Sequence, residues 1–203
     1  MRIFLAGATG VIGVRLVPLL VEAGHTVAGM TRTPAKAPQV RELGAQPVVC
    51  DVFDLEALRG AVTAFDPELV MHQLTDLPDD VEQIGDYGER NDRMRREGTA
   101  NLLAAARAAG IPGRRFLAQS IAWKLPGKRG ENTEAFERLV LDAGGIIIRY
   151  GQLYGPGTFY PAEAPPPPRV HVDEAARATL GLLEAEPGVV EVVEPAEPGA
   201  GAR

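Results

Sequence analysis

A glycine-rich loop lies near the start of the chain, where Gly7, Gly10 and Gly13 stand in the segment GATGVIG. It follows a short apolar run and precedes a segment whose apolar residues have helical spacing. Because glycine has no Cβ, such a loop can turn tightly and its backbone can approach a diphosphate group. The N-terminus of the following helix adds unpaired N–H groups and a partial positive charge. The loop predicts a binding site for the diphosphate of a dinucleotide; the alternative is a tight turn without a ligand.

The expected cofactor contacts lie in this loop and at the end of the fourth predicted strand. Doubly wound sheets bind their ligands at the carboxyl ends of the strands, so both segments should reach one site. The residues expected to contact the cofactor here are Gly7, Thr9, Gly10, Val11, Ile12, Gly13, Gln73, Leu74 and Thr75.

Arg32 follows the second predicted strand in the segment MTRTP, between Thr31 and Thr33. An NAD-specific protein would place an acidic residue here, where it holds the ribose hydroxyls. A guanidinium can instead grip a 2′-phosphate with two hydrogen bonds. The sequence therefore favours NADP(H) over NAD(H), with a solvated surface arginine as the alternative.

Two hydroxyl side chains are the candidates for catalysis, Ser120 and Tyr154. Ser120 ends the fifth predicted strand, and Tyr154 follows the sixth in the segment RYGQLYGPG, as does Tyr150. A serine hydroxyl can hydrogen-bond a carbonyl or orient a nicotinamide ring, although it can equally cap the strand end. A phenol at the same edge could approach the pocket or pack in the turn.

The other titratable side chains near these strand ends fit structural or solvated positions better. His72 lies inside the apolar fourth strand, and His171 precedes the last predicted helix, so both are expected to pack. Lys124 and Lys128 follow Ser120 and could steer an anionic substrate, or simply be solvated.

Short apolar runs alternate with helical patterns along the whole chain. The predicted strands are residues 2–7, 26–32, 45–51, 68–74, 114–120, 145–151 and 188–194. The predicted helices are residues 11–23, 35–43, 54–63, 92–109, 132–143 and 173–186, the last with Asp173 as N-cap. Near-continuous apolar strands alternating with helices predict an α/β fold, a doubly wound parallel sheet of about seven strands covered on both faces.

The 203 residues predict a single domain over residues 1–193, followed by a disordered tail at 194–203. The segment 161–169 is proline-rich and should be a stiff connector. Cys50 is the one cysteine, so no internal disulfide can form, and the three histidines have no metal-ligand spacing.

The net charge of −6 argues against a nucleic-acid partner, which would require clustered positive charge. No apolar run has the length of a signal peptide core or a membrane span. We therefore expect a cytoplasmic protein that acts on a small molecule and can form a homodimer, with neither a membrane nor a nucleic acid as partner.

Several longer motifs resemble the short-chain dehydrogenase/reductase superfamily, in the branch of the epimerase/dehydratases and atypical members. They are VVCDV, EGTANLLAAARAAG, RRFLAQS, IIIRYGQLYGPG and VHVDEAARA, in this order over about 190 residues. The resemblance implies a Rossmann fold, places Asp51 and Val52 beside the adenine, and identifies Ser120 as the active-site serine.

The chain departs from this superfamily at its proton donor. The resemblance leads us to expect a tyrosine and, four residues later, a lysine, but a match on Glu137 puts Arg129 and Thr133 in these positions. Arginine does not deprotonate in proteins and threonine carries no charge. About a dozen residues also stand where extended members insert a substrate subdomain, which implies a much reduced C-terminal substrate region.

Three functions remain open on the sequence alone. The first is an NAD(P)H-dependent oxidoreductase that acts on a small or planar acceptor, since solvent can supply the proton for such a reaction. The second is a non-catalytic NADP(H)-binding sensor or regulatory protein. The third is an enzyme of the epimerase/dehydratase lineage that uses non-standard catalytic groups such as Ser120 or Tyr154.

Overall fold

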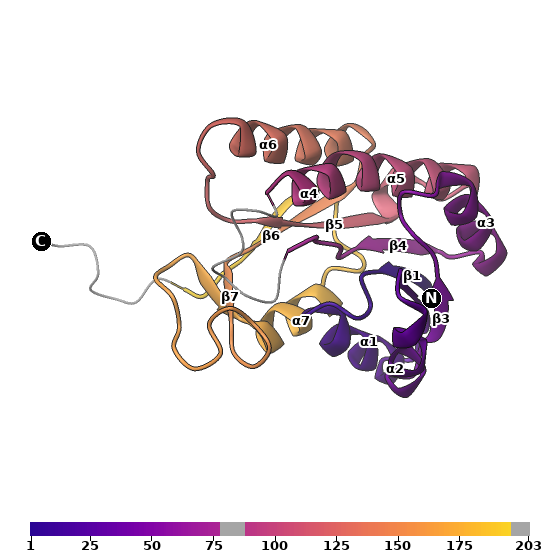
Figure 1. Cartoon of the computed structure of the whole chain (residues 1–203), viewed down its shortest axis with the longest axis horizontal. Helices are drawn as coiled ribbons and strands as arrows, with labels where there is room; N and C mark the ends of the chain where they lie inside the picture. Colours follow the sequence, from indigo (N-terminus) through magenta and orange to yellow (C-terminus); the bar gives the residue numbers. More distant parts are fainter. Residues whose placement is uncertain (78–87, 196–203) are drawn as a thin grey trace, which may run out of the picture.

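The fold is a seven-stranded parallel sheet with helices on both faces (Figure 1). The computed structural model describes residues 1–77 and 88–195. The sheet strands are β1 (Arg2–Ala6), β2 (Thr26–Thr31), β3 (Gln46–Val49), β4 (Leu69–His72), β5 (Phe116–Ile121), β6 (Ile146–Tyr150) and β9 (Gly188–Val192). Their order in space is β3-β2-β1-β4-β5-β6-β9, so the direction of strand order reverses between β1 and β4. The predicted doubly wound α/β fold is confirmed.

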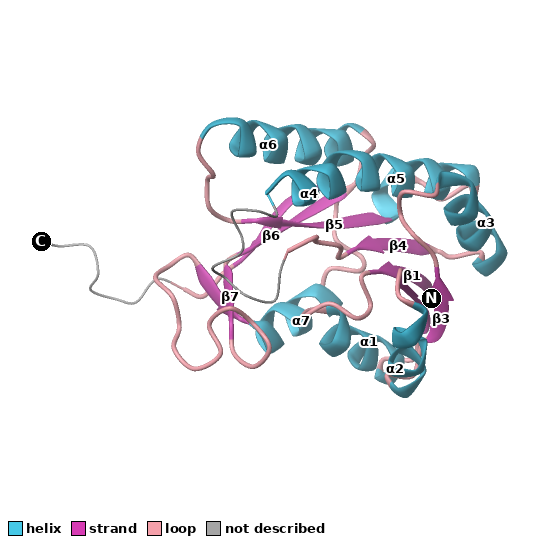
Figure 2. Cartoon of the chain, in the orientation of Figure 1, coloured by secondary structure: helices cyan, strands magenta, loops and turns pink. Residues whose placement is uncertain are grey.

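The helices form one layer on each face of the sheet (Figure 2). One layer holds α1 (Gly13–Glu22), α2 (Ala37–Glu42) and α7 (Val172–Leu180). The other holds α3 (Leu55–Phe65), α4 (Gly88–Arg93), α5 (Thr99–Ala108) and α6 (Gly127–Asp142). None of the helices in the described part of the chain is long and apolar enough to cross a membrane.

Alternating residues of each strand feed two separate cores. In β1, Ile3 and Leu5 pack beneath α1 and α7, whereas Phe4 and Ala6 pack beneath α3 and α5. All four side chains are fully buried. A strand buried on both faces reads as a continuous apolar run, and this is why the sheet could be recognised in the sequence.

The long helix predicted over residues 92–109 is interrupted. It begins four residues earlier, at Gly88, and α4 passes through a π-helical turn, η3 (Met94–Gly98), before α5 starts at Thr99. Such single π turns are rare and often lie at functional sites. The helical spacing of apolar residues in a sequence does not predict where such a turn interrupts the helix.

The start of one further helix and the N-cap of another differ from the prediction. Helix α6 begins at Gly127, five residues before the predicted start at residue 132. The N-cap of α7 is His171 rather than Asp173, because the His171 Nδ1 atom accepts a hydrogen bond from the Asp173 backbone N–H at 3.3 Å. Side-chain preferences favour aspartate as an N-cap, but His171, two residues before Asp173, caps this helix instead.

A second, two-stranded parallel sheet was not predicted. It pairs β7 (Gln152–Tyr154) with β8 (Arg169–His171), on either side of the proline-rich segment. Glu194, which the sequence assigns to the tail, is bound to this sheet: its backbone N–H donates to the Arg169 carbonyl oxygen at 2.8 Å. The rest of the predicted tail, from residue 196, lies outside the described residues.

Candidate cofactor-binding and active site

The glycine loop joins β1 to α1 and leaves no room for side chains. Gly7 has φ of +97°, and a Cβ there would lie 2.5 Å from the Gln73 carbonyl oxygen. A Cβ on Gly13 would lie 2.1 Å from the Gly7 carbonyl oxygen and 2.8 Å from the Ala8 carbonyl oxygen. Such contacts are far inside van der Waals distance, so both positions require glycine. The cradle that a dinucleotide diphosphate needs is therefore present in the backbone.

The N-terminus of α1 carries no competing group. Its N-cap, Ile12, makes no side-chain capping bond, and the first turn holds no acidic residue. The first N–H groups of a helix have no intrahelical partner, and together with the helix dipole they favour an anion. The loop and the helix N-terminus thus fit the diphosphate of a dinucleotide cofactor.

The β4 edge lies directly beside this loop. The Gln73 backbone N–H donates to the Ala6 carbonyl oxygen at 2.8 Å, which extends the pairing of β4 with β1. The Gln73 side chain is buried and its Nε2 atom donates to the Tyr150 hydroxyl at 3.3 Å. Its Oε1 atom has no hydrogen-bond partner among the described residues. The edge formed by Gln73, Leu74 and Thr75 therefore borders the loop, as the sequence predicts.

The Tyr150 hydroxyl has a fixed role inside the protein. It lies 2.5 Å from the Thr179 Oγ1 atom, and Thr179 donates its own proton to the Ala175 carbonyl oxygen at 2.7 Å. Thr179 has only one proton to give, so Tyr150 must be the donor in the first bond. Burial raises the pKa of Tyr150 to about 12. This phenol is a structural group rather than an acid that serves a substrate.

His72 is a structural histidine, as expected. It is 1% exposed, and its Nδ1 atom accepts from the Leu74 backbone N–H at 3.2 Å. The proton must then sit on Nε2, which lies 2.9 Å from the Thr99 Oγ1 atom. Burial lowers the pKa of His72 to about 4, so the ring is neutral near pH 7.

This pKa predicts how stability depends on pH. The folded-state pKa is below the ordinary value of about 6.5, so the unfolded chain takes up the proton first as the pH falls. The neutral ring makes its full contribution to the free energy of unfolding above pH 6.5. About 3 kcal/mol of this free energy is lost as the pH falls toward 4. Urea unfolding of the wild type and of His72→Gln at pH 7 and pH 4 measures this loss. We expect the variant to lose about 3 kcal/mol less than the wild type over this range; equal losses would contradict the assignment.

Ser120, at the end of β5, is hydrogen-bonded to Glu137, which in turn pairs with Arg149, and neither charged residue was predicted to belong to the site. Ser120 is 5% exposed and donates its proton to the Glu137 Oε1 atom at 2.5 Å. The Arg149 guanidinium donates to the same carboxylate, through Nε at 3.0 Å and Nη2 at 2.6 Å. Glu137 lies on the buried face of α6 between Phe136 and Val140. A carboxylate on an apolar helix face was the signal that could have revealed this pair.

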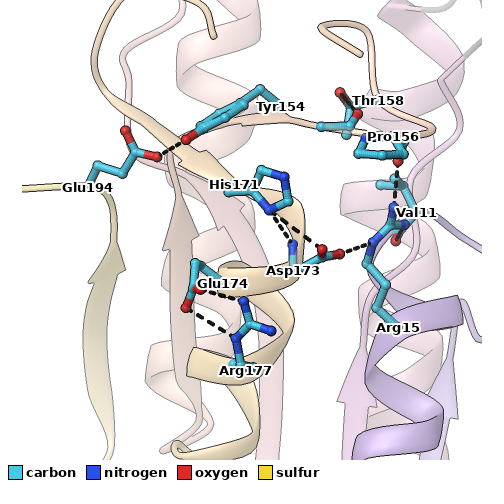
Figure 3. Close-up of polar contacts among 11 residues, drawn as sticks. Val11, Arg15, Tyr154, Pro156, Thr158, His171, Asp173, Glu174, Arg177 and Glu194 are labelled. Atoms are coloured by element: carbon cyan, nitrogen blue, oxygen red, sulfur yellow. Dashed lines mark hydrogen bonds and ion pairs between the residues drawn. The ribbon is translucent and has the colours of Figure 1, made fainter. Parts of the chain in front are cut away.

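Tyr154 belongs to a polar cluster where the C-terminal part of the chain meets α1 (Figure 3). Its hydroxyl donates to the Glu194 carboxylate, and its ring stands edge-on against His171 with centroids 5.1 Å apart. The hydrogen bond to Glu194 is the main reason why the pKa of Tyr154 is raised. Arg169 also donates to Glu194, at 2.9 Å.

Arg15 joins this cluster to the glycine loop (Figure 3). Its Nε atom donates to the Asp173 Oδ1 atom at 2.6 Å, and its Nη1 atom donates to the Val11 carbonyl oxygen at 2.8 Å. Its Nη2 atom donates to the Pro156 carbonyl oxygen at 2.5 Å. The turn that follows Tyr154 is thus fixed against the start of α1. Arg15 was not predicted as a site residue, because its partners Pro156 and Asp173 are 141 and 158 residues away.

Arg32, at the end of β2, shares a carboxylate with a second arginine. Its Nη2 atom lies 3.3 Å from the Asp76 Oδ1 atom. Arg90, on α4, donates to both carboxylate oxygens of Asp76, at 3.1 Å and 3.0 Å. Asp76 is buried, whereas about half of each arginine side chain is exposed. Two guanidinium groups therefore share the Asp76 carboxylate at this end of the sheet.

Asp51 and Val52 follow β3 at the same edge. The exposed Asp51 accepts a hydrogen bond from the Phe53 backbone N–H at 3.0 Å. Val52 is buried, and its carbonyl oxygen accepts from the Asn101 side chain at 2.9 Å. The structure therefore brings the ends of β1, β2, β3 and β4 together, with every predicted cofactor contact at this edge; their contacts with a cofactor stay predictions.

The positions expected for a tyrosine–lysine pair lie on the first turns of α6. Thr133 donates to the Arg129 carbonyl oxygen at 2.9 Å. The same hydroxyl oxygen accepts from the Nη1 atom of Arg95, which lies on the π-helical turn, at 2.7 Å. A cation from another helix therefore reaches the position where the resemblance implies a lysine.

Sequence comparison supports a nucleotide-binding role for this edge. Residues 7–143 match the profile of a family described as NAD(P)H-binding. The chain belongs to this NAD(P)H-binding family. A 3-diazoavenalumate denitrifying reductase from Streptomyces sp is 36% identical over 228 aligned positions, which cover 92% of this chain and 73% of the relative.

Solved structures show the fold of this NAD(P)H-binding protein in other enzymes. UDP-glucose 4-epimerase from Thermotoga maritima, crystallised with UDP-glucose, has a TM-score of 0.76 at 17% identity, covering 95% of this chain and 77% of the epimerase. A putative NAD-dependent epimerase/dehydratase from Bacillus halodurans has a TM-score of 0.72 at 19% identity, covering 98% and 96%. Together with the family match and the reductase relative, these folds confirm the predicted resemblance to the short-chain dehydrogenase/reductase superfamily.

Proposed function

We propose that this protein is an NADP(H)-preferring reductase of a small or planar acceptor, and that the acceptor requires no proton from the protein. One observation carries the proposal. Both candidate hydroxyls already donate their protons to internal acceptors, Ser120 to Glu137 and Tyr154 to Glu194, and the neighbouring Tyr150 hydroxyl donates to Thr179. The hydroxyl groups near the glycine loop therefore have their protons in internal hydrogen bonds and offer none to a substrate.

The residues at the site have separate tasks in this proposal. Backbone amides of the glycine loop and of the start of α1 bind the diphosphate, apart from those of Ala8, Gly10 and Val14, which donate to backbone carbonyl oxygens. Arg32 would hold the 2′-phosphate, supported by the nearby Arg90. Ser120 keeps its oxygen lone pairs free to accept a hydrogen bond, so it can orient a carboxamide N–H group. NADPH, when bound, supplies a hydride.

The chemistry of the acceptor follows from the missing proton. An aryl diazonium group needs hydride alone: a C–H bond forms, the C–N bond breaks, and N₂ leaves with the electron pair of that bond. A planar quinone or flavin takes hydride and then acquires its proton from water. The Streptomyces relative is named as a reductase of a diazo compound, which supports the first of these acceptor classes.

Isotope transfer from NADPH tests the function. We expect the protein to oxidise NADPH carrying deuterium at C4 and to place that deuterium on carbon when an aryl diazonium carboxylate is the acceptor. Because no protein hydroxyl gives up a proton in this scheme, Ser120→Ala and Tyr154→Phe should lower kcat by less than about tenfold, against the 10²–10⁴-fold loss typical of a removed general acid. Product deuteration is read by mass spectrometry.

Two other outcomes point to the functions that the sequence left open. Tight NADPH binding with no turnover across diazonium, quinone and flavin acceptors would indicate a non-catalytic binding protein. A loss of about 10³-fold in kcat for Ser120→Ala or Tyr154→Phe would indicate that one of them is the proton donor. Either result contradicts the proposal.

A further inference from the structure

Arg95 is a cation that the proposed function does not use. It lies on the π-helical turn η3 and is only partly exposed. Burial lowers the pKa of its guanidinium, although arginine remains charged in proteins. Keeping a guanidinium out of water is costly unless its charge is compensated. The site should therefore offer Arg95 a partner.

Within the described part of the chain, Arg95 has only a neutral hydrogen-bond partner. Among residues 1–77 and 88–195, the one hydrogen bond of Arg95 goes to the Thr133 hydroxyl, and no carboxylate lies within ion-pair distance. The two carboxylates nearest in electrostatic terms are Asp92 and Glu137. Both are engaged elsewhere: Asp92 accepts from Asn132 at 2.7 Å, and Glu137 accepts from Ser120 and Arg149. Arg95 therefore forms no ion pair among the described residues, and Asp92 and Glu137 act on its charge only from beyond ion-pair distance.

The position of Arg95 relates it to Ser120 through α6. Thr133, which orients the guanidinium, and Glu137, which holds the serine hydroxyl, are one helical turn apart on the buried face of α6. This spacing corresponds to a rise of about 6 Å along the helix. Arg95 and Ser120 therefore reach the same face of α6, at the carboxyl edge of the sheet where such folds bind ligands.

Both ends of the neighbouring loop add positive charge. Lys124 follows β5 and Lys128 lies in the first turn of α6, and both side chains are exposed. In a chain with a net charge of −6, these two exposed lysines between β5 and α6 favour the approach of an anion to this loop.

We propose that Arg95 binds a carboxylate group of the acceptor. The enzyme would then prefer planar aromatic acceptors that carry a carboxylate over their neutral analogues. That the bound molecule is the hydride acceptor rests on the proposed function, but binding of a carboxylate at Arg95 does not depend on turnover. The guanidinium provides two parallel N–H donors for a carboxylate, while Thr133 fixes its plane.

Equilibrium binding tests this carboxylate-binding site without catalysis. Benzoate and the neutral benzamide are titrated by calorimetry into the protein, with and without NADP⁺. We expect benzoate to bind about tenfold or more tightly than benzamide, as a charge-assisted hydrogen-bonded pair requires. Arg95→Met should abolish this preference, and Arg95→Lys should retain part of it because the charge stays. Arg96→Met, which removes an exposed charge from the next residue, should leave the preference unchanged.

Several results would overturn the inference. Equal binding of benzoate and benzamide by the wild type, or saturable binding of neither, would do so without any variant. A preference that survives in Arg95→Met, or one that disappears in Arg96→Met, would also do so. A loss of about tenfold or more in NADPH affinity in Arg95→Met would assign the guanidinium to the cofactor instead. An absence of turnover with intact benzoate selectivity would reject the reductase and leave the carboxylate-binding site standing.

Discussion

Replacement of Gly13 by alanine is expected to abolish measurable NADPH binding and to lower the free energy of unfolding by about 3 kcal/mol. The new Cβ would lie 2.1 Å from the Gly7 carbonyl oxygen and 2.8 Å from two backbone atoms of Ala8. These neighbours are backbone, so no side-chain rotation can relieve the contact. The loop must move away from the start of α1, and the amides that form the diphosphate cradle then diverge. Calorimetric titration with NADPH and urea unfolding measure the two effects.

Gly60→Ala is the matched control for this prediction. Gly60 lies inside α3, is exposed, and would gain a Cβ with open space around it. Because alanine is the better helix former, this variant should be more stable by up to about 1 kcal/mol and should bind NADPH normally. A Gly13→Ala protein that binds NADPH within about threefold of the wild type would show that the diphosphate lies elsewhere.

Arg32→Asp is expected to weaken NADPH binding by about 100-fold while leaving NADH binding within a few-fold of the wild type. The change removes a guanidinium that can pair with the 2′-phosphate and introduces a carboxylate that repels it. The repulsion is reinforced by Asp76, which lies 3.3 Å from Arg32 in the native protein. Arg90 still pairs with Asp76 through both oxygens, so the fold around the site should persist. Separate titrations with NADPH and NADH give the ratio of affinities.

The control for Arg32→Asp is Arg41→Asp, which makes the same change in net charge on the exposed surface of α2. It should change the affinity for each cofactor by less than about twofold, because an exposed charge is screened beyond about 10 Å. An equal loss of NADPH and NADH binding in Arg32→Asp would show that the arginine does not distinguish the two cofactors.

The sheet and the glycine loop could be predicted because their signals are local. The buried strands are short, almost continuous apolar runs, and the loop between β1 and α1 needs glycines at positions where a Cβ cannot fit. The π-helical turn η3 could not be predicted, because no local sequence pattern marks it. The start of α6 and the N-cap of α7 were also mispredicted, since helix boundaries are the least certain part of a sequence pattern and a histidine rather than the aspartate caps α7.

The polar networks of the site could not be predicted, because each joins residues far apart in the sequence. Ser120, Glu137 and Arg149 meet only when β5, α6 and β6 are packed side by side. The same holds for Arg95 and Thr133, which are 38 residues apart. Residue types at strand ends predict where a site lies, whereas the direction in which each hydroxyl donates its proton depends on partners that only the fold supplies.

Calorimetric titration of the wild-type protein with NADPH and with NADH measures whether the glycine loop holds a dinucleotide. We predict saturable binding of one NADPH per chain, with NADPH preferred over NADH by about tenfold or more, since one ribose phosphate gains a charge-assisted partner. No heat and no saturation with either cofactor at millimolar concentration would contradict it.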